Sequence, residues 1–337
     1  MHKRQKWIAD WREQNALSAQ QVPAALRLAG IPPPSHEWRA WIDRLLLWLG
    51  VAALLSGLIF FVAANWSGMG RFFKFALAES VIIVSLAAYV WGARFRYGNA
   101  ALLVASLALG ALLALIGQTY QTGADTYQLF LVWALLILPW VLAARLPALW
   151  VLWLAILHVA YVFFVNTFEA RRSFFPVNEN IFIGAILLDG LALTAWEWFS
   201  TQGRAWMRGR WVPRLLALTM SAAITALMVY FILDNSQHSQ DKRYLLYFFA
   251  YFLILAGMYG VYRRKIPDIF MPASGALSLI VVATTGLGRI LLGGRHSDAL
   301  FAFFLLGLFS LLATAGAAWW LRQIAREMKE YRAEDSP

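Results

Sequence analysis

Long runs of apolar residues, each about the length of a membrane-spanning helix, recur between residues 45 and 321. An α-helix rises 1.5 Å per residue, so about 20 residues cross the ~30 Å hydrocarbon core of a bilayer. In lipid, backbone polar groups must find partners within the protein, which favours helices. Charged residues, Gly or Pro separate the runs, which lie near residues 45–64, 72–92, 99–117, 128–144, 148–166, 180–200, 213–233, 244–262, 269–288 and 299–321. The sequence therefore predicts an all-α, polytopic transmembrane helix bundle of about 10 spans.

The overall composition agrees with a membrane protein. Hydrophobic residues make up 61% of the chain and charged residues 14%, whereas soluble domains average about 45–50% and about 25%. This balance excludes a soluble enzyme and a disordered chain. The chain has no cysteine, which excludes disulfides and thiolate chemistry.

The distribution of basic residues predicts the orientation. With the N-terminus inside, 21 of the 29 Lys and Arg residues fall on the cytoplasmic side and 8 on the other. Cytoplasmic loops of membrane proteins collect Lys and Arg, so both termini are predicted to be cytoplasmic. The same rule accounts for the net charge of +11, and we expect no nucleic-acid partner.

The first 44 residues form a separate, polar segment. They contain no early apolar run, so no cleavable signal peptide is expected. Ser18 and Gln21 match a capping box, and the helix that they open is expected to run from Val22 to Gly30, before three prolines. The alternative is a solvated, partly frayed tail. We therefore divide the chain into a cytosolic helical segment (1–44), spans 1–5 (45–166), spans 6–10 (167–321) and a cytosolic tail (322–337).

Few ionisable side chains lie within the spans, where they are costly and usually face a protein interior. Glu79 is either a proton or cation site or a structural carboxylate paired with Arg71 or Lys74. His158 and Asp189 lie near the middle of adjacent spans and are candidates for a proton relay, the alternative being a structural hydrogen bond. Glu197 is expected to be an ordinary interfacial residue.

The richest polar stretch, residues 117–127, joins the third and fourth spans on the predicted outer face. Its amides and hydroxyls offer donors and acceptors that suit a sugar, a lipid headgroup or a peptide bond. The alternative is a solvated turn in which Asp125 caps the next helix. The predicted outward-facing pocket consists of Asn65, Glu79, Gln118, Tyr120, Gln121 and Asp125.

Several of these residues belong to a wider pattern. Ala63-Ala64-Asn65-Trp66 closes the first run, and Leu115-Ile116-Gly117-Gln118-x-Tyr120 precedes Asp125 and Leu129-Phe130-Leu131-x-Trp133-Ala134-Leu135. Over about residues 5–165 the chain resembles a bacterial membrane-protein family, domain of unknown function 2157. The resemblance implies a polytopic protein of the bacterial inner membrane and brings no catalytic residues with it.

No P-loop, dinucleotide-binding, metalloprotease or hydrolase motif occurs, and we expect no catalytic residues, metal site or cofactor. An enzyme is not favoured, because the membrane part holds too few polar groups for a catalytic set. The leading hypothesis is a transporter-like or lipid- or glycan-handling protein that binds a small molecule, lipid or glycan in the outward pocket. The alternative is an accessory or sensor scaffold that binds a protein partner through residues 1–44.

Overall fold

The computed structural model describes residues 62–92, 98–121, 123–169, 179–233, 242–293 and 299–334, together with short stretches before residue 62. The chain consists of two compact units, Met1–Phe73 and Lys74–Pro337. Regular structure in the described residues is helical throughout, which confirms the predicted all-α class. The helices are α2 (Val22–Leu28), α4 (Arg71–Gly92), α5 (Gly98–Tyr120), α6 (Thr126–Ala144), α7 (Pro147–Glu169), α8 (Glu179–Thr201), α9 (Trp211–Leu233), α10 (Lys242–Arg264), α11 (Phe270–Leu292) and α12 (Ala299–Glu334), with 3-10 turns η1 (Trp66–Gly68) and η2 (Ala205–Met207).

Nine helices in the described ranges, α4 to α12, are long and apolar enough to cross a membrane. They coincide with the second to tenth apolar runs of the sequence, which confirms a multi-pass membrane bundle. The first predicted span, 45–64, lies largely outside the described residues. The positions that are described within it, such as Leu46, Ala53 and Phe60, are helical.

In the first unit, the predicted capping box is formed in part. The backbone N–H of Ser18 donates to Oε1 of Gln21 at 3.0 Å, and α2 begins at the next residue. This contact satisfies one of the free N–H groups that every helix start leaves.

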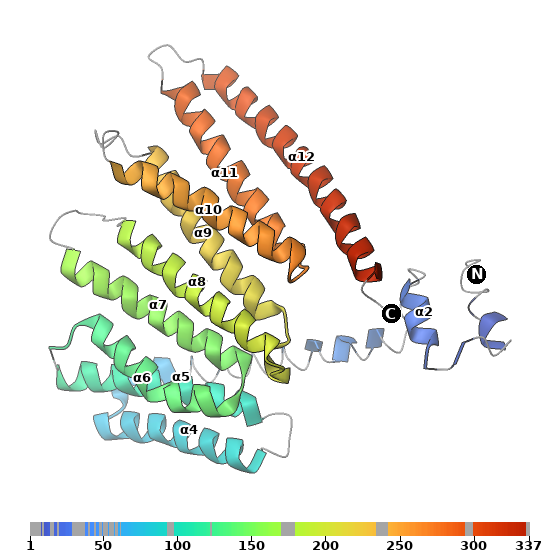
Figure 1. Ribbon diagram of the computed structural model, residues 1–337. Coiled ribbons are helices and arrows are strands. Elements are labelled where there is room, and N and C mark those ends of the chain that lie inside the picture. The colour runs from blue at the N-terminus through green and yellow to red at the C-terminus, as the bar shows by residue number, and fades with distance from the viewer. Residues whose placement is uncertain are drawn as a thin grey trace. The chain divides into compact units, whose positions relative to one another are not determined.

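In the second unit, helices that follow one another in the chain pack side by side from α5 to α9, as Figure 1 shows for α6 to α9. Helix α9 also packs against α11, and α11 contacts both α10 and α12. The largest buried cluster joins α7, α8, α9, α10 and α11 around residues such as Trp196, Leu216 and Met271. This cluster lies at the end of the helices where the loops 202–210 and 265–269 connect them, which we call the arginine-rich end.

Two prolines, Pro139 and Pro147, lie within the 128–166 stretch, and the structure shows how each is accommodated. Helix α6 continues through Pro139, whereas α7 starts at Pro147. Proline suits the first helical position because the N–H that it lacks would have no helical partner there. Between them, Arg145 adopts a left-handed conformation with φ of 50° and ends α6.

The last helix is longer than its apolar run predicts. Helix α12 extends over 36 residues to Glu334, beyond the predicted end of the span at residue 321. The added turns are rich in charged helix-forming residues. Arg263 at the end of α10 pairs with Glu327 at 2.6 Å, and the ring of Tyr259 stacks on Trp320 at 5.4 Å. These contacts hold the extension of α12 against α10.

Candidate functional site

A histidine and an aspartate meet in the interior of two neighbouring spans. Nε2 of His158 on α7 lies 3.3 Å from Oδ1 of Asp189 on α8, within ion-pair distance although not aligned as a hydrogen bond. The Asp189 side chain is 2% exposed and the His158 side chain 28%. The second carboxylate oxygen, Oδ2, is buried and has no hydrogen-bond partner among the described residues. The sequence placed these two residues at similar depth, and the structure brings them together.

The geometry around His158 requires a proton between the two side chains. Nδ1 of His158 lies 2.8 Å from the carbonyl oxygen of Leu154, which can only accept, so Nδ1 carries a hydrogen. In a neutral imidazole Nε2 would then be a bare acceptor facing an ionised carboxylate, and two acceptors repel. A proton on Nε2 or on Asp189 removes the repulsion.

The residues of the predicted outward pocket are exposed in the structure. Asn65 belongs to the first unit, and the other candidates lie in the second: Glu79, Gln118, Tyr120, Gln121 and Asp125. The ring of Tyr120 on α5 lies 6.1 Å from the ring of Phe75 on α4. Phe75 precedes Glu79 by one helical turn. Asp125 stands at the N-cap position of α6 but makes no capping bond with its side chain. This ring contact joins α4 to α5. No other contact in the described part of the chain brings the candidate side chains into one enclosed site.

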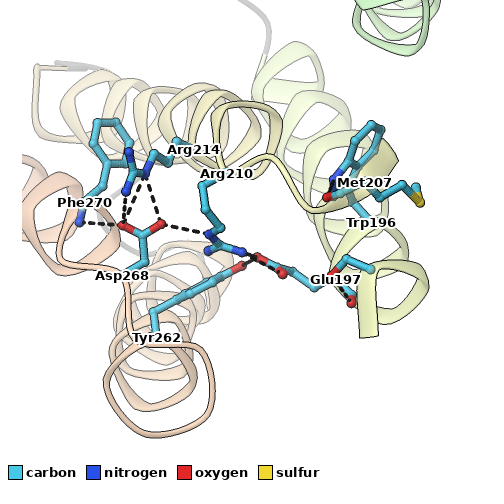
Figure 2. A network of polar contacts seen from close by, with 9 residues as sticks. Trp196, Glu197, Met207, Arg210, Arg214, Tyr262, Asp268 and Phe270 are labelled. Atoms are coloured by element: carbon cyan, nitrogen blue, oxygen red, sulfur yellow. Dashed lines mark hydrogen bonds and ion pairs between the residues drawn. The ribbon is translucent and has the colours of Figure 1, made fainter. Parts of the chain in front are cut away.

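A network of polar and charged side chains joins three helices and two loops at the arginine-rich end (Figure 2). Nη1 of Arg210 donates to both carboxylate oxygens of Glu197, at 2.8 and 2.9 Å, and Nε donates to Asp268 at 3.1 Å. Asp268 also accepts two bonds from Nε of Arg214, at 3.0 and 3.2 Å, and one from Nη2 at 3.1 Å. The hydroxyl of Tyr262 donates to Glu197 at 3.0 Å. Two buried acids thus balance two partly exposed arginines.

The charges of this network are stabilised by their neighbours. Burial disfavours ionised Asp268, but the bonds from Arg214, from the N–H of Phe270 at 3.1 Å and from Arg210 outweigh burial and hold the pKa of Asp268 below its ordinary value. Burial likewise opposes the charge of Arg210, but attraction to Glu197 outweighs it and raises the pKa of Arg210. Asp268 and Arg210 therefore stay ionised near neutral pH.

Hydroxyl groups continue the polar contacts between α9, α10 and α11. Ser278 lies 2.6 Å from Oγ1 of Thr225 and 2.9 Å from the hydroxyl of Tyr251. One turn nearer the charged network, Oγ of Ser221 lies 3.4 Å from Oγ of Ser274. Such bonds join transmembrane helices, where small and polar residues let backbones approach closely. Among the described residues, no three His, Asp or Glu side chains converge as a metal site would require.

The charged network was missed by the sequence analysis. Glu197, expected to be an ordinary interfacial residue, is buried and bonded to Arg210 and Tyr262. The sequence does carry one signal. Asp268 is an acid just after the basic run 263–265, and two arginines one turn apart open the 213–233 span. An acid that lies among basic residues at one end of the bundle indicates an ion-pair partner there.

Comparison with known proteins covers the first part of the chain. Residues 9–150 match the model of a family described as Predicted membrane protein (DUF2157), which confirms the resemblance that the motifs predict over residues 5–165. No curated protein and no solved structure matches the chain. The match ends before His158, so both the His158–Asp189 pair and the charged network lie beyond it. The protein is thus an integral, multi-pass membrane protein that is similar to this family over residues 9–150.

Proposed function

We propose that the protein is transporter-like and that the His158–Asp189 pair binds the proton that drives it. The observation that carries this proposal is the close approach of the two side chains inside adjacent spans, at 3.3 Å. Ionisable groups in such positions are costly and commonly mark ion or proton pathways. The pair can hold a proton without net charge, as imidazolium with carboxylate or as imidazole with carboxylic acid.

The surroundings of the pair support exchange of that proton. His158 is the more accessible of the two side chains, while Asp189 is buried. Oδ2 of Asp189 is an acceptor without a hydrogen-bond partner among the described residues. It can therefore accept a hydrogen bond from a water molecule or bind a proton. A proton delivered to His158 is therefore well placed to pass to Asp189.

In this proposal the exposed polar residues of the outer face receive the transported molecule. They suit a sugar, a lipid headgroup or a peptide bond, and they are Asn65, Glu79, Gln118, Tyr120, Gln121 and Asp125. The arginine-rich end then faces the cytoplasm of a bacterial cell, and both termini lie there, as the distribution of Lys and Arg favours. The membrane is the inner membrane.

A second candidate function is an accessory or sensor scaffold. It is favoured by the division of the chain, because Met1–Phe73 is a compact unit distinct from the rest. In that case residues 1–44 bind a protein partner and the membrane part holds them in place. Deletion of residues 1–40 separates the two functions, since a transporter retains its flux and a scaffold loses its partner.

Proton flux into proteoliposomes tests the leading proposal. Vesicles are loaded with a pH-sensitive dye, and a potassium gradient with valinomycin makes their lumen electrically negative. The assay is run with and without a mixture of sugars and dipeptides outside. We expect wild type to acidify the lumen faster than protein-free vesicles, and Asp189→Asn and His158→Gln to lose most of that flux. Glu327→Gln, which breaks an ion pair between α10 and α12, serves as the control. Equal flux in wild type and Asp189→Asn would contradict the proposal.

A further inference from the structure

A large apolar cavity opens at the arginine-rich end between α7, α8 and the loop 202–210. Its volume is about 420 Å³, within the range of ligand sites. The wall combines leucine and alanine with four tryptophans and a single charged residue, Arg204; the tryptophans are Trp150, Trp153, Trp196 and Trp206. A cavity with this lining suits the hydrocarbon part of an amphiphile.

The cavity is reached from the side of the bundle. Leu191 on α8 and Leu142 on α6 line it and are also 71% and 59% exposed on the outer surface of the helices. In a spanning bundle, exposed leucines of this kind face the lipid chains. A lipid can therefore place a chain in the cavity without leaving the bilayer.

The polar groups of the lining are donors. Nε1 of Trp150 is buried and has no hydrogen-bond partner among the described residues. The indoles of Trp153 and Trp196 are already used, since they donate to the carbonyls of Ala134 at 3.0 Å and Met207 at 3.2 Å. None of these three N–H groups is therefore open to an occupant, since two are already bonded and that of Trp150 is enclosed by protein atoms.

The charge of the lining is positive. The guanidinium of Arg204 lies over the ring of Phe199 at 4.4 Å, and both residues line the cavity. Glu197, which follows the lining residue Trp196 in the chain, is bonded to Arg210. No carboxylate belongs to the lining. The complementary ligand is therefore an anion with an apolar chain.

We propose that this cavity is a binding site for an anionic phospholipid. One acyl chain lies along the leucine and tryptophan wall, and the phosphate pairs with Arg204. Tryptophan suits this level of the membrane, where its apolar ring and polar N–H meet the headgroup layer. The site does not rest on the proposed proton function, because neither His158 nor Asp189 lines the cavity.

Native mass spectrometry of the full chain in detergent tests the site. The probes are dioleoyl phosphatidylglycerol and its zwitterionic counterpart dioleoyl phosphatidylcholine, added separately over a concentration series, with oleate as a third arm. We expect wild type to retain one phosphatidylglycerol at least tenfold more tightly than phosphatidylcholine or oleate, a tenfold change being ordinary for one charge-assisted contact.

Two variants probe the two parts of the lipid. Arg204→Gln removes the charge of an exposed side chain and should weaken retention of phosphatidylglycerol about tenfold, to the level of phosphatidylcholine. Ala192→Leu narrows the cavity and should weaken both lipids. Arg264→Gln is the matched control, because it removes an exposed arginine at the same end that does not line the cavity.

The proposal fails if Arg204→Gln retains phosphatidylglycerol as wild type does, or if Arg264→Gln weakens it equally. Equal retention of the two phospholipids by wild type would show a general acyl groove and also overturn the anionic site. Tighter retention of oleate than of phosphatidylglycerol would assign the cavity to a fatty acid instead.

Discussion

Replacement of Asp268 by asparagine should strongly destabilise the contact between α9 and α11. Asp268 is buried and accepts bonds from Arg210, Arg214 and the N–H of Phe270. The Asp268→Asn variant has nearly the same volume, but it leaves two guanidinium groups without their shared anion. Removing one partner of a buried ion pair costs about 3–5 kcal/mol. Arg210 keeps Glu197, and Arg214 is 45% exposed, so we expect the low end, about 3 kcal/mol.

The free energy of unfolding of both proteins can be measured by titration with SDS in mixed micelles. Glu327→Gln is the control, because it breaks a pair in which the acid is 52% exposed and should cost less than about 1 kcal/mol. If Asp268→Asn lost no more than this control, the network would not hold the helices together, and the reasoning from burial would be refuted.

The same variant makes a prediction about pH. The pKa of Asp268 is lowered in the folded protein from its ordinary value of 3.8, so the native state binds this proton less readily than the unfolded state. The stabilisation is therefore complete above about pH 4 and is lost as the pH falls further toward the folded pKa. The difference in unfolding free energy between wild type and Asp268→Asn should stay constant from about pH 5 to pH 8 and shrink below about pH 4.

Three further substitutions test the packing of the helices by the same SDS titration. A Cβ at position 184 would overlap the ring of Tyr161, so Gly184→Ala should destabilise the α7–α8 contact by about 1–3 kcal/mol. Gly190→Ala, whose Cβ would meet only Sδ of Met220 at 3.5 Å, should be nearly neutral. Ser278→Ala removes bonds to two neighbouring helices and leaves the buried hydroxyl of Tyr251 without that partner; at about 0.6 kcal/mol per bond, a loss of about 1 kcal/mol is expected.

The spans were predictable because a single physical quantity, the length of an apolar run, decides them. The predicted run 180–200 became Glu179–Thr201, and 213–233 became Trp211–Leu233. The end of α12 was not predictable in this way. Hydropathy predicts where a helix leaves the lipid. Helix α12 continues beyond that point through charged residues, and the ion pair of Arg263 with Glu327 holds this part in place.

The candidate sites divide by how far apart their residues lie in the chain. His158 and Asp189 belong to adjacent spans, so similar depth was enough to suggest that they meet. Glu197 and Asp268 share Arg210 but lie 71 positions apart, and their contact depends on how α9 packs between α8 and α11. Arg210 and Arg214 were counted only as positive charges that orient the protein in the membrane. Because the preference of cytoplasmic loops for Lys and Arg already explains these charges, their ion pairs were not predicted.

The two proposed sites meet at Leu154, whose carbonyl accepts from His158 while its side chain lines the lipid cavity. We expect them to act independently nevertheless. Nδ1 of His158 donates to this carbonyl whether the pair's proton lies on Nε2 or on Asp189, and the carbonyl belongs to the regular backbone of α7. A change of protonation therefore leaves the Leu154 side chain in place. Asp189→Asn should lose most of the proton flux yet retain phosphatidylglycerol as wild type does. One full charged contact changes affinity about tenfold. If Asp189→Asn changed the retention of phosphatidylglycerol by more than this, the backbone of α7 would transmit the protonation state of the pair to the cavity.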